Sequence, residues 1–321
     1  MVAAIETEGL TKRYGSGADA VVAVDDLDLT VPEGSVFGFL GRNGAGKSTT
    51  IDMLLDFATP TAGSATVFGH DATTESRQIR ERTGVLPEGF DVYRRLTGRE
   101  HLDWVIDTRG TDDDPDRLLD LVDLVDAADR KAGGYSKGMQ QRLGLAMALA
   151  GDPDLLLLDE PSSGLDPTAM QELRETLRER AASGTTIFFS SHVLGEVEAV
   201  CDRVAILREG RLVAQDTIEA LRDEADVAPT VTLSVADPVD TDDLADLDGI
   251  AQATTDGDRV TVVCTDPSRK VDAVRVVAER TTVTDLTSTA TSLETLFNRY
   301  TGDEVGETDR SAPTTPRGAD G

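Results

Sequence analysis

The chain has 321 residues, 39% of them hydrophobic, which is enough for one large α/β domain and a smaller second one. Its longest apolar runs, such as 143–150 and 155–158, fall well short of the ~20 residues that cross a bilayer. The opening residues MVAAIETEGL lack a basic segment followed by an apolar stretch, so we expect no secretory signal. Any membrane role is therefore expected to come through a partner.

The charge balance is strongly acidic. Sixty Asp and Glu residues against 31 Lys and Arg residues give a net charge of −29. The acidity is spread over the whole chain rather than confined to a tail, which favours a halophilic organism, an archaeon in our interpretation, over an ordinary acidic protein. In molar salt the repulsion between carboxylates is screened to within ~3 Å. The same charge opposes binding to DNA, RNA or anionic lipid, so we expect no nucleic-acid partner.

The two cysteines, Cys201 and Cys264, lie far apart and lack the spacing of metal ligands. We expect both to be buried as small apolar side chains in a reducing compartment.

The first segment predicts short strands. Residues 5–10 and 21–31 alternate loosely between apolar and polar, and a turn at 14–17 separates them. The continuous apolar run 36–40 is typical of a strand buried on both faces. A glycine-rich loop follows it, and then a helix from about 47 to 57.

The middle segment, about 88–149, is predicted to be mostly helical. Residues 97–100 (TGRE) form a capping box that opens one helix, and apolar residues between 118 and 125 have helical spacing on the next. After it strands and helices alternate, with strands at 155–158, 185–190 and 204–207 and helices at 168–180 and 194–200. This alternation implies parallel strands, so we expect the helical segment to be an insertion into an α/β domain.

A charged stretch near 222–226 predicts a domain boundary. Beyond it, 231–235 and 260–264 alternate like strands, Asp256-Gly257 favours a hairpin turn, and 270–280 and 293–300 have helical spacing. We predict a first domain at 1–222, a small α+β domain at 228–300 and a disordered tail at 301–321.

The strongest motif is the glycine-rich loop, which matches G-x-x-x-x-G-K-[ST] between the buried strand and the helix. Glycines let the loop wrap closely, so that backbone N–H groups and the helix N-terminus face phosphate oxygens. Lys47 is expected to neutralise the β- and γ-phosphates of ATP, and the Ser48 hydroxyl to bind Mg²⁺. The residues expected to bind nucleotide here are Gly41, Asn43, Gly44, Ala45, Gly46, Lys47, Ser48 and Thr49.

Two carboxylates, Asp159 and Glu160, end the apolar run 155–158. Ligands of open α/β sheets bind at the carboxyl ends of strands, so both acids are expected to face the phosphates. We expect Asp159 to bind Mg²⁺ directly or through water, and Glu160 to accept a proton from the attacking water.

Four further segments resemble the ABC ATPase family over residues 1 to about 222. Residues 135–142 (YSKGMQQR) resemble the family's signature, 163–166 (SGLD) its D-loop, His192 its switch histidine, and Tyr14 the aromatic residue that stacks on adenine. The order and spacing of these segments are those of the family. The resemblance implies a P-loop α/β nucleotidase core with an ABC-type antiparallel β subdomain and a helical insertion.

The resemblance also implies a mechanism. Two copies, identical or paralogous, would face head to tail, and Ser136 and Gly138 of one copy would bind the γ-phosphate held by the other. Asp166 would lie at the same interface, and His192 would contact the γ-phosphate and orient the water. Catalysis would fall to Glu160, His192 and Lys47. The expected partner is a multi-span permease, with this chain bound peripherally at the cytoplasmic face of the cell membrane.

Three positions depart from the family pattern. Lys137 replaces a glycine and Met139 a glutamine in the signature, and Glu88 stands where the family usually has a glutamine that senses Mg²⁺. A carboxylate can still bind Mg²⁺, so we expect Glu88 to keep that role with an altered metal or pH dependence. His70 and His101 have no motif around them and are expected at the surface.

Residues 292–302 (SLETLFNRYTG) resemble the ending of ATPases from drug- and antibiotic-export ABC systems. This resemblance favours export, and it does not identify the transported substrate. An alternative is a soluble ABC-type ATPase that remodels a macromolecular complex, but a single nucleotide domain and the acidic surface argue against it. A catalytically weak paralogue is a further alternative, which the presence of Glu160 and His192 disfavours.

Overall fold

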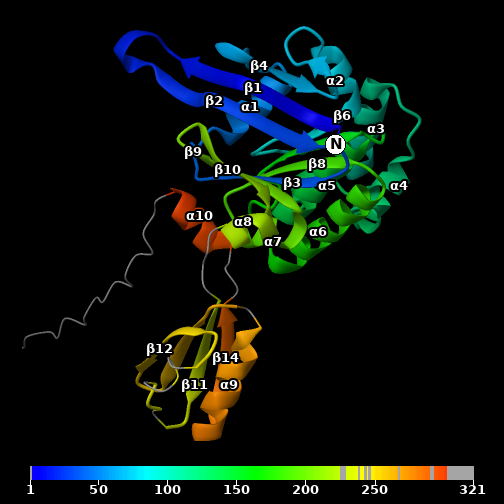
Figure 1. Ribbon diagram of the computed structural model, residues 1–321. Coiled ribbons are helices and arrows are strands. Elements are labelled where there is room, and N and C mark those ends of the chain that lie inside the picture. The colour runs from blue at the N-terminus through cyan, green and yellow to red at the C-terminus, as the bar shows by residue number, and fades with distance from the viewer. Residues whose placement is uncertain are drawn as a thin grey trace, which may run out of the picture.

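The computed structural model describes residues 2–224, 229–237, 239–241, 244, 247–266, 268–289 and 293–301. Within these ranges the strands form three sheets, two of which lie in the main body while the third lies apart from it (Figure 1). None of the helices in these ranges is long and apolar enough to cross a bilayer.

The central sheet has six strands in the order β10-β9-β3-β8-β7-β6. Five are parallel, and β10 pairs with β9 as an antiparallel edge. Their bounds are β3 Val36–Gly41, β6 Thr83–Leu86, β7 Leu155–Asp159, β8 Thr186–Ser191, β9 Arg203–Arg208 and β10 Arg211–Thr217. The predicted parallel α/β core is confirmed, and the continuous apolar runs β3 and β7 are buried along their whole length.

The second sheet is antiparallel, in the order β2-β1-β4-β5. Its strands are β1 Ala3–Tyr14, β2 Val21–Pro32, β4 Ala62–Val67 and β5 His70–Asp71. The helix α1 (Lys47–Leu54) shares one core with both sheets, because Met53 and Leu54 are buried with Phe39 of β3 and Leu10 of β1. This is the antiparallel subdomain that the resemblance implied. A short helix, α2 (Ser76–Arg82), leads from it to β6.

The helical insertion lies between β6 and β7, as predicted. It contains α3 (Gly98–Arg109), α4 (Pro115–Asp120) and α5 (Lys137–Leu149). The capping box is present, since the Glu100 backbone N–H donates to Thr97 Oγ1 (3.1 Å) and the Thr97 N–H to Glu100 Oε2 (2.7 Å). The second predicted helix is shorter than expected, because Asp123 adopts a left-handed φ of 52° and ends the regular backbone.

His101, expected at the surface, is fully buried, so that expectation is wrong. Its Nδ1 lies 2.6 Å from the carbonyl oxygen of Thr97, and its Nε2 accepts a hydrogen bond of 3.0 Å from the Tyr93 N–H. A neutral imidazole with one donor and one acceptor satisfies both backbone groups, so it can occupy an apolar helix face without a free polar atom. His70 is partly buried and pairs with Glu75 at 3.1 Å.

Three helices cover the central sheet near β8 and β9, namely α6 (Pro167–Ala182), α7 (Leu194–Val200) and α8 (Ile218–Glu224). A Cβ on Gly38 of β3 would lie 2.4 Å from Val197 Cγ1, so the glycine allows α7 to approach the sheet closely. Cys201 follows α7 and is buried, which raises the pKa of its thiol. Cys264 is fully buried in the third sheet, so both cysteines pack as expected.

The third sheet is antiparallel, in the order β12-β13-β11-β14. Its strands are β11 Thr230–Val235, β12 Ile250–Asp256, β13 Arg259–Cys264 and β14 Val283–Thr289, and α9 (Arg269–Arg280) packs on it around a separate core. Gly257 forms the predicted hairpin turn with φ +62°. Neither β12 nor β14 was predicted, because β12 is mostly exposed and carries no clear alternation.

The last helix, α10 (Leu293–Thr301), packs on the main body rather than on the third sheet (Figure 1). Leu293, Leu296 and Phe297 are buried in the same core as Val197 and Val200 of α7 and Leu221 of α8. The predicted small domain, 228–300, included this helix, and that part of the boundary is wrong. An apolar stripe shows that a helix face is covered but not what covers it. Of the predicted tail, 302–321 lies outside the described residues.

Candidate nucleotide site

The glycine-rich loop joins the end of β3 to the start of α1, and its geometry requires glycine at two positions. Gly46 has φ +107° and Gly44 has φ +83°, in the left-handed region. A Cβ on Gly46 would also lie 2.4 Å from the carbonyl oxygen of Ala23 in β2. The loop therefore sits tightly against the antiparallel sheet, with the N-terminal N–H groups of α1 at its end, an arrangement suited to an anion.

A cavity of about 370 Å³ lies over this loop. It is lined by Ala23, Asn43, Gly44, Gly46, Lys47, Ser48, Thr49, Glu88 and Glu160. The fold thus brings two carboxylates from distant parts of the chain to the loop, as the sequence predicted. Ala23 was not predicted, and no pattern in the sequence marks it.

Lys47 is a buried residue of the cavity lining. Its side chain is 6% exposed, and its Nζ donates to the Gly41 carbonyl oxygen (2.8 Å) and forms an ion pair of 3.1 Å with Glu160 Oε1. The ion pair is not aligned as a hydrogen bond, so within the described chain Glu160 Oε1 is a buried acceptor without a hydrogen-bond donor. The buried ammonium of Lys47 suits a negatively charged ligand, and the Glu160 oxygen that lacks a hydrogen-bond donor suits a ligand that can donate a proton.

Glu160 is held in a strained backbone conformation, with φ +50°. Its N–H donates to the carbonyl oxygen (3.2 Å) and to Oγ (3.1 Å) of Ser190, the neighbouring residue at the end of β8. Its Oε2 lies 2.7 Å from Nδ1 of His192. The strain is of the kind that active sites retain when surrounding contacts fix it. Ser190 was missed by the sequence analysis, although it is the polar end of an apolar strand.

Asp159, Ser48 and Glu88 are the three residues expected to bind Mg²⁺, and each carries a side-chain oxygen atom. Asp159 is buried and accepts a hydrogen bond from Ser190 Oγ, and the Ser48 hydroxyl donates to Glu88 Oε2 at 3.5 Å. Burial, and to a lesser degree the charge of Asp159, raises the pKa of the Asp52 carboxyl group.

No three His, Cys, Asp or Glu side chains within the described ranges form a group that could hold a metal alone. A hydroxyl and one or two carboxylates fit Mg²⁺, which prefers hard oxygen ligands and completes its shell with water and phosphate.

The signature and D-loop residues form a second group that does not line this cavity. Ser136 Oγ caps α5 by accepting from the Met139 N–H (3.2 Å), and Asp166 Oδ1 caps α6 by accepting from the Ala169 N–H (2.9 Å). A Cβ on Gly138 would lie 3.5 Å from Ala169 Cβ, so the two helix starts are in contact. Within one chain these residues are therefore separate from the phosphate loop they were predicted to complete.

Lys137 and Met139, which depart from the family signature, both contact neighbouring segments. The Lys137 side chain lies across Gly164, whose Cβ would be 3.3 Å from Lys137 Cγ, so the lysine bridges signature and D-loop segments. Met139 Sδ accepts a hydrogen bond of 3.3 Å from Arg130.

Tyr14 ends β1 with 45% of its surface exposed. The ammonium of Lys12 lies 5.0 Å from its ring centroid, and Tyr14 pairs with Val21, two residues before Ala23 in the cavity wall. The ring is thus exposed and paired with the strand that carries Ala23, and its stacking role stays a prediction.

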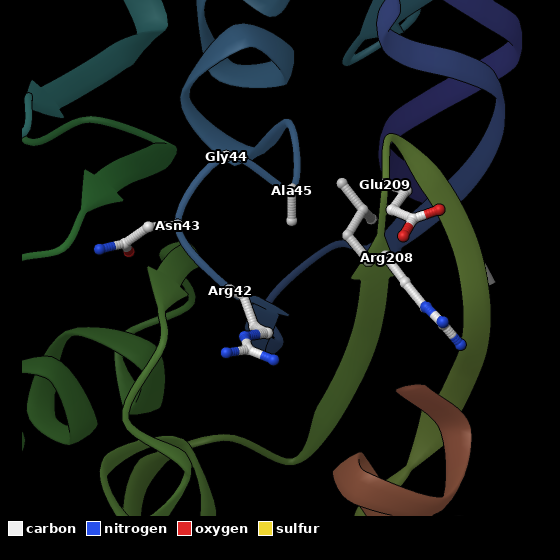
Figure 2. Close-up of a pocket in the computed structure, with 7 residues that line it drawn as sticks. Arg42, Asn43, Gly44, Ala45, Arg208 and Glu209 are labelled. Carbon is white, nitrogen blue, oxygen red and sulfur yellow. The ribbon is translucent and has the colours of Figure 1, made fainter. Parts of the chain in front are cut away.

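A second cavity, of about 240 Å³, lies between the phosphate loop and the β9–β10 turn. Figure 2 shows Arg42 and Ala45 on this side of the loop, with Arg208 and Glu209 from the turn, whereas Asn43 points away from Arg208 and Glu209. The loop is therefore bordered by a cavity on each side.

A parallel sheet with a phosphate loop after β3, and paired carboxylates at the carboxyl end of β7, defines a P-loop nucleoside triphosphatase.

Comparisons with known proteins narrow this class. The family model described as ABC transporter matches residues 24–163. The chain is 40% identical over 220 residues to the bacitracin transport ATP-binding protein BcrA of Enterococcus faecalis, covering 68% of this chain and 70% of that one. It is 42% identical over 224 residues to the daunorubicin/doxorubicin resistance ATP-binding protein DrrA of Streptomyces peucetius, covering 68% and 67%. A solved ATP-binding subunit of an ABC transporter superposes with a TM-score of 0.61 at 30% identity, over 69% of this chain and 92% of the other.

The chain belongs to the family of ABC transporter ATP-binding subunits. It binds and hydrolyses ATP as the nucleotide-binding subunit of a transporter.

Proposed function

We propose that this chain powers export through a separate membrane-spanning permease, as one of two ATPase subunits that close around ATP. The observation that carries the proposal is a chain of contacts centred on Glu160. Lys47 and Glu160 line the cavity over the phosphate loop and form an ion pair of 3.1 Å, and His192 Nδ1 lies 2.7 Å from the other oxygen of Glu160. A cation and a hydrogen-bonding imidazole thus contact the two oxygens of one carboxylate.

The proposed chemistry uses each of these groups. Lys47 exchanges its ion pair with Glu160 for the β- and γ-phosphate oxygens, which leaves the carboxylate free to act as a base. A water attacks the γ-phosphorus, the bond to the β–γ bridging oxygen breaks, and Glu160 takes the proton of the water. His192 orients Glu160 and contacts the γ-phosphate. The products are ADP and phosphate.

Mg²⁺ is the proposed cofactor, held by Ser48 and Asp159 with Glu88 beside them. It would neutralise the negative charge of the β- and γ-oxygens. The hydroxyl and carboxylate oxygens in the cavity support this assignment.

We further propose that Ser136, Gly138 and Asp166 act across a dimer of ATPase subunits. Their separation from the phosphate loop of their own chain supports this role, because such residues can complete a site only in a second subunit. The N-terminus of α5 at Ser136 offers N–H groups to the γ-phosphate. Identical and paralogous partners both satisfy this geometry.

Export as the direction is supported by the names of relatives. One protein that is 41% identical over 219 residues is a fluoroquinolones export ATP-binding protein of Mycobacterium tuberculosis. Docking under a permease would place the chain peripherally at the cytoplasmic face of the cell membrane. The net charge of −29, distributed along the chain, supports a halophilic, archaeal source.

The decisive experiment uses Glu160→Gln, which keeps the shape of the side chain and removes the base. In molar KCl with saturating ATP and Mg²⁺, the variant is expected to bind ATP and elute as a dimer, while hydrolysis falls by about 10²–10⁴-fold. Glu81→Gln serves as the control, because it makes the same change at an exposed carboxylate that does not line the cavity. A monomeric Glu160→Gln chain, or one that hydrolyses ATP at the original rate, would refute the proposal.

A further inference from the structure

Glu196, in the first turn of α7, is a buried carboxyl group that the proposed chemistry does not use. Its side chain is 6% exposed, and one of its oxygens, Oε2, accepts hydrogen bonds from the hydroxyls of both Ser162 and Ser191. Ser162 is two residues after Glu160, and Ser191 immediately precedes His192. Glu196 Oε2 therefore joins two segments: the one that follows Glu160 and the one that leads into His192.

Apart from Ser162 and Arg174, the residues that line the space beside Glu196 are apolar. A space of only about 10 Å³ adjoins it, lined by Ser162, Met170, Leu173, Arg174, Leu177, Phe189, Glu196 and Val200. This is at the lower limit for one water molecule, so the two hydroxyls are direct partners of the carboxyl group. Burying a carboxyl group among apolar side chains is costly, and an apolar residue would fill this position at lower cost.

Both serines also make backbone hydrogen bonds on either side of the reacting groups. Ser191 Oγ, besides donating to Glu196 at 3.3 Å, accepts a hydrogen bond of 2.9 Å from the Val193 N–H. His192 lies inside this turn. On the other side, the Leu165 N–H donates to the carbonyl oxygen of Ser162 (3.0 Å), which ties Ser162 to the segment leading to Asp166.

We propose that Glu196 is a positioning residue, which holds His192 at hydrogen-bond distance from Glu160 and couples both to the segment that carries Asp166. It acts through Ser162 and Ser191 and does not contact nucleotide. The inference rests on the proposed roles of Glu160 and His192. A displacement of about 1 Å between reacting groups costs roughly 100-fold in rate, so loss of this junction lowers kcat more than it weakens ATP binding.

The test compares three variants of the full chain in ATPase assays. Glu196→Leu removes the shared acceptor, and kcat is expected to fall about 10–100-fold while the KM for ATP changes less than about threefold. Glu196→Gln keeps an acceptor oxygen of the same reach, so it is expected to retain activity within about threefold of the original. Equal losses for Gln and Leu would overturn the hydrogen-bonding role.

The third variant separates positioning from stability. Ser162→Ala, Ser191→Ala and Glu196→Leu together remove the carboxyl group and both hydroxyls that donate to it. The Val193 N–H loses Ser191 Oγ as its acceptor, but Val193 is 40% exposed, so the unfolding midpoint is expected to stay close to the original. The kcat is nevertheless expected to be as low as in Glu196→Leu. Recovery of the original kcat in this stable triple variant would show that Glu196 serves only the packing of its neighbourhood.

A double-mutant cycle with His192 supplies a readout that a purely structural role would not change. In a His192→Ala background, Glu196→Leu is expected to cause little further loss of kcat, because the group it positions is gone. Equal fold losses in both backgrounds would overturn the proposal. If Glu160→Gln abolishes hydrolysis and the Glu196 variants do not affect it, this inference alone fails. If Glu160→Gln leaves hydrolysis intact, the proposed function fails first.

Discussion

Lys47 and Glu160 form an ion pair of 3.1 Å in which both side chains are 6% exposed. They come from the loops after β3 and β7, strands that are separated in the sheet by β8. The group expected to bind phosphate and the group expected to activate water thus neutralise each other. In the proposed mechanism ATP binding breaks this pair, which would link occupation of the phosphate loop to release of the base.

The ion pair makes a prediction about the stability of the nucleotide-free chain. Lys47→Met leaves Glu160 as a buried charge with only His192 beside it, so the free energy of unfolding is expected to fall by about 3–5 kcal/mol. The double variant Lys47→Met, Glu160→Gln is expected to recover most of this loss. Denaturant unfolding measures both.

An exposed ion pair provides the control. Arg77 and Glu81 lie 2.8 Å apart with 86% and 60% of their side-chain surfaces exposed, so Arg77→Met is expected to leave stability unchanged. If the losses from Lys47→Met and Glu160→Gln simply add in the double variant, the two groups are not coupled.

Glu88→Gln tests whether this unusual residue sets the metal dependence. Glu88 lies in the cavity beside Ser48, and its replacement removes a negative charge from the proposed cation site. The Mg²⁺ concentration for half-maximal ATPase activity is expected to rise about tenfold, measured at fixed ATP. Glu81→Gln, on the exposed face of α2, is the control. If the original chain and Glu88→Gln have the same ATPase rate and the same Mg²⁺ dependence, the Glu88 carboxylate does not take part in metal binding.

The position of α10 predicts which part of the chain it stabilises. Leu296 is fully buried against the main body, so Leu296→Ala is expected to destabilise the nucleotide-binding part by about 2–5 kcal/mol. Thermal loss of ATP binding reports on that part. Val271→Ala, at a position of α9 that is 64% exposed, is expected to have no effect. Unchanged thermal loss of ATP binding in Leu296→Ala would contradict the packing of α10.

The net charge of −29 predicts that stability depends on salt. Repulsion between carboxylates reaches about 10 Å at 0.1 M ionic strength and about 3 Å at 1 M, so dialysis from molar KCl into dilute buffer is expected to lower the unfolding midpoint. Circular dichroism at several KCl concentrations follows the change. A midpoint that does not move over this range is incompatible with a protein adapted to high salt.

Local patterns were predicted well because the residues that create them are contiguous. The strand, loop and helix around Lys47 follow one another along 36–54, and the capping box at Thr97 involves four consecutive residues. The prediction for His101 failed although its partners Thr97 and Tyr93 are only four and eight residues away, because burial depends on how the chain packs. His101 and Glu196 are buried polar residues whose partners accommodate them, and only the packing shows that those partners are present.

The sequence by itself determined which chemical groups this protein carries: a phosphate loop, two acids after an apolar strand, a histidine after another, and a net charge of −29. Only the tertiary structure decided that β8 lies between β3 and β7, which brings Ser190 to Asp159 and His192 to Glu160. It also decided that α10 returns to α7 and α8. The reason is physical: a motif specifies groups along a chain, whereas a hydrogen bond between residues some thirty positions apart depends on which strands become neighbours in the sheet.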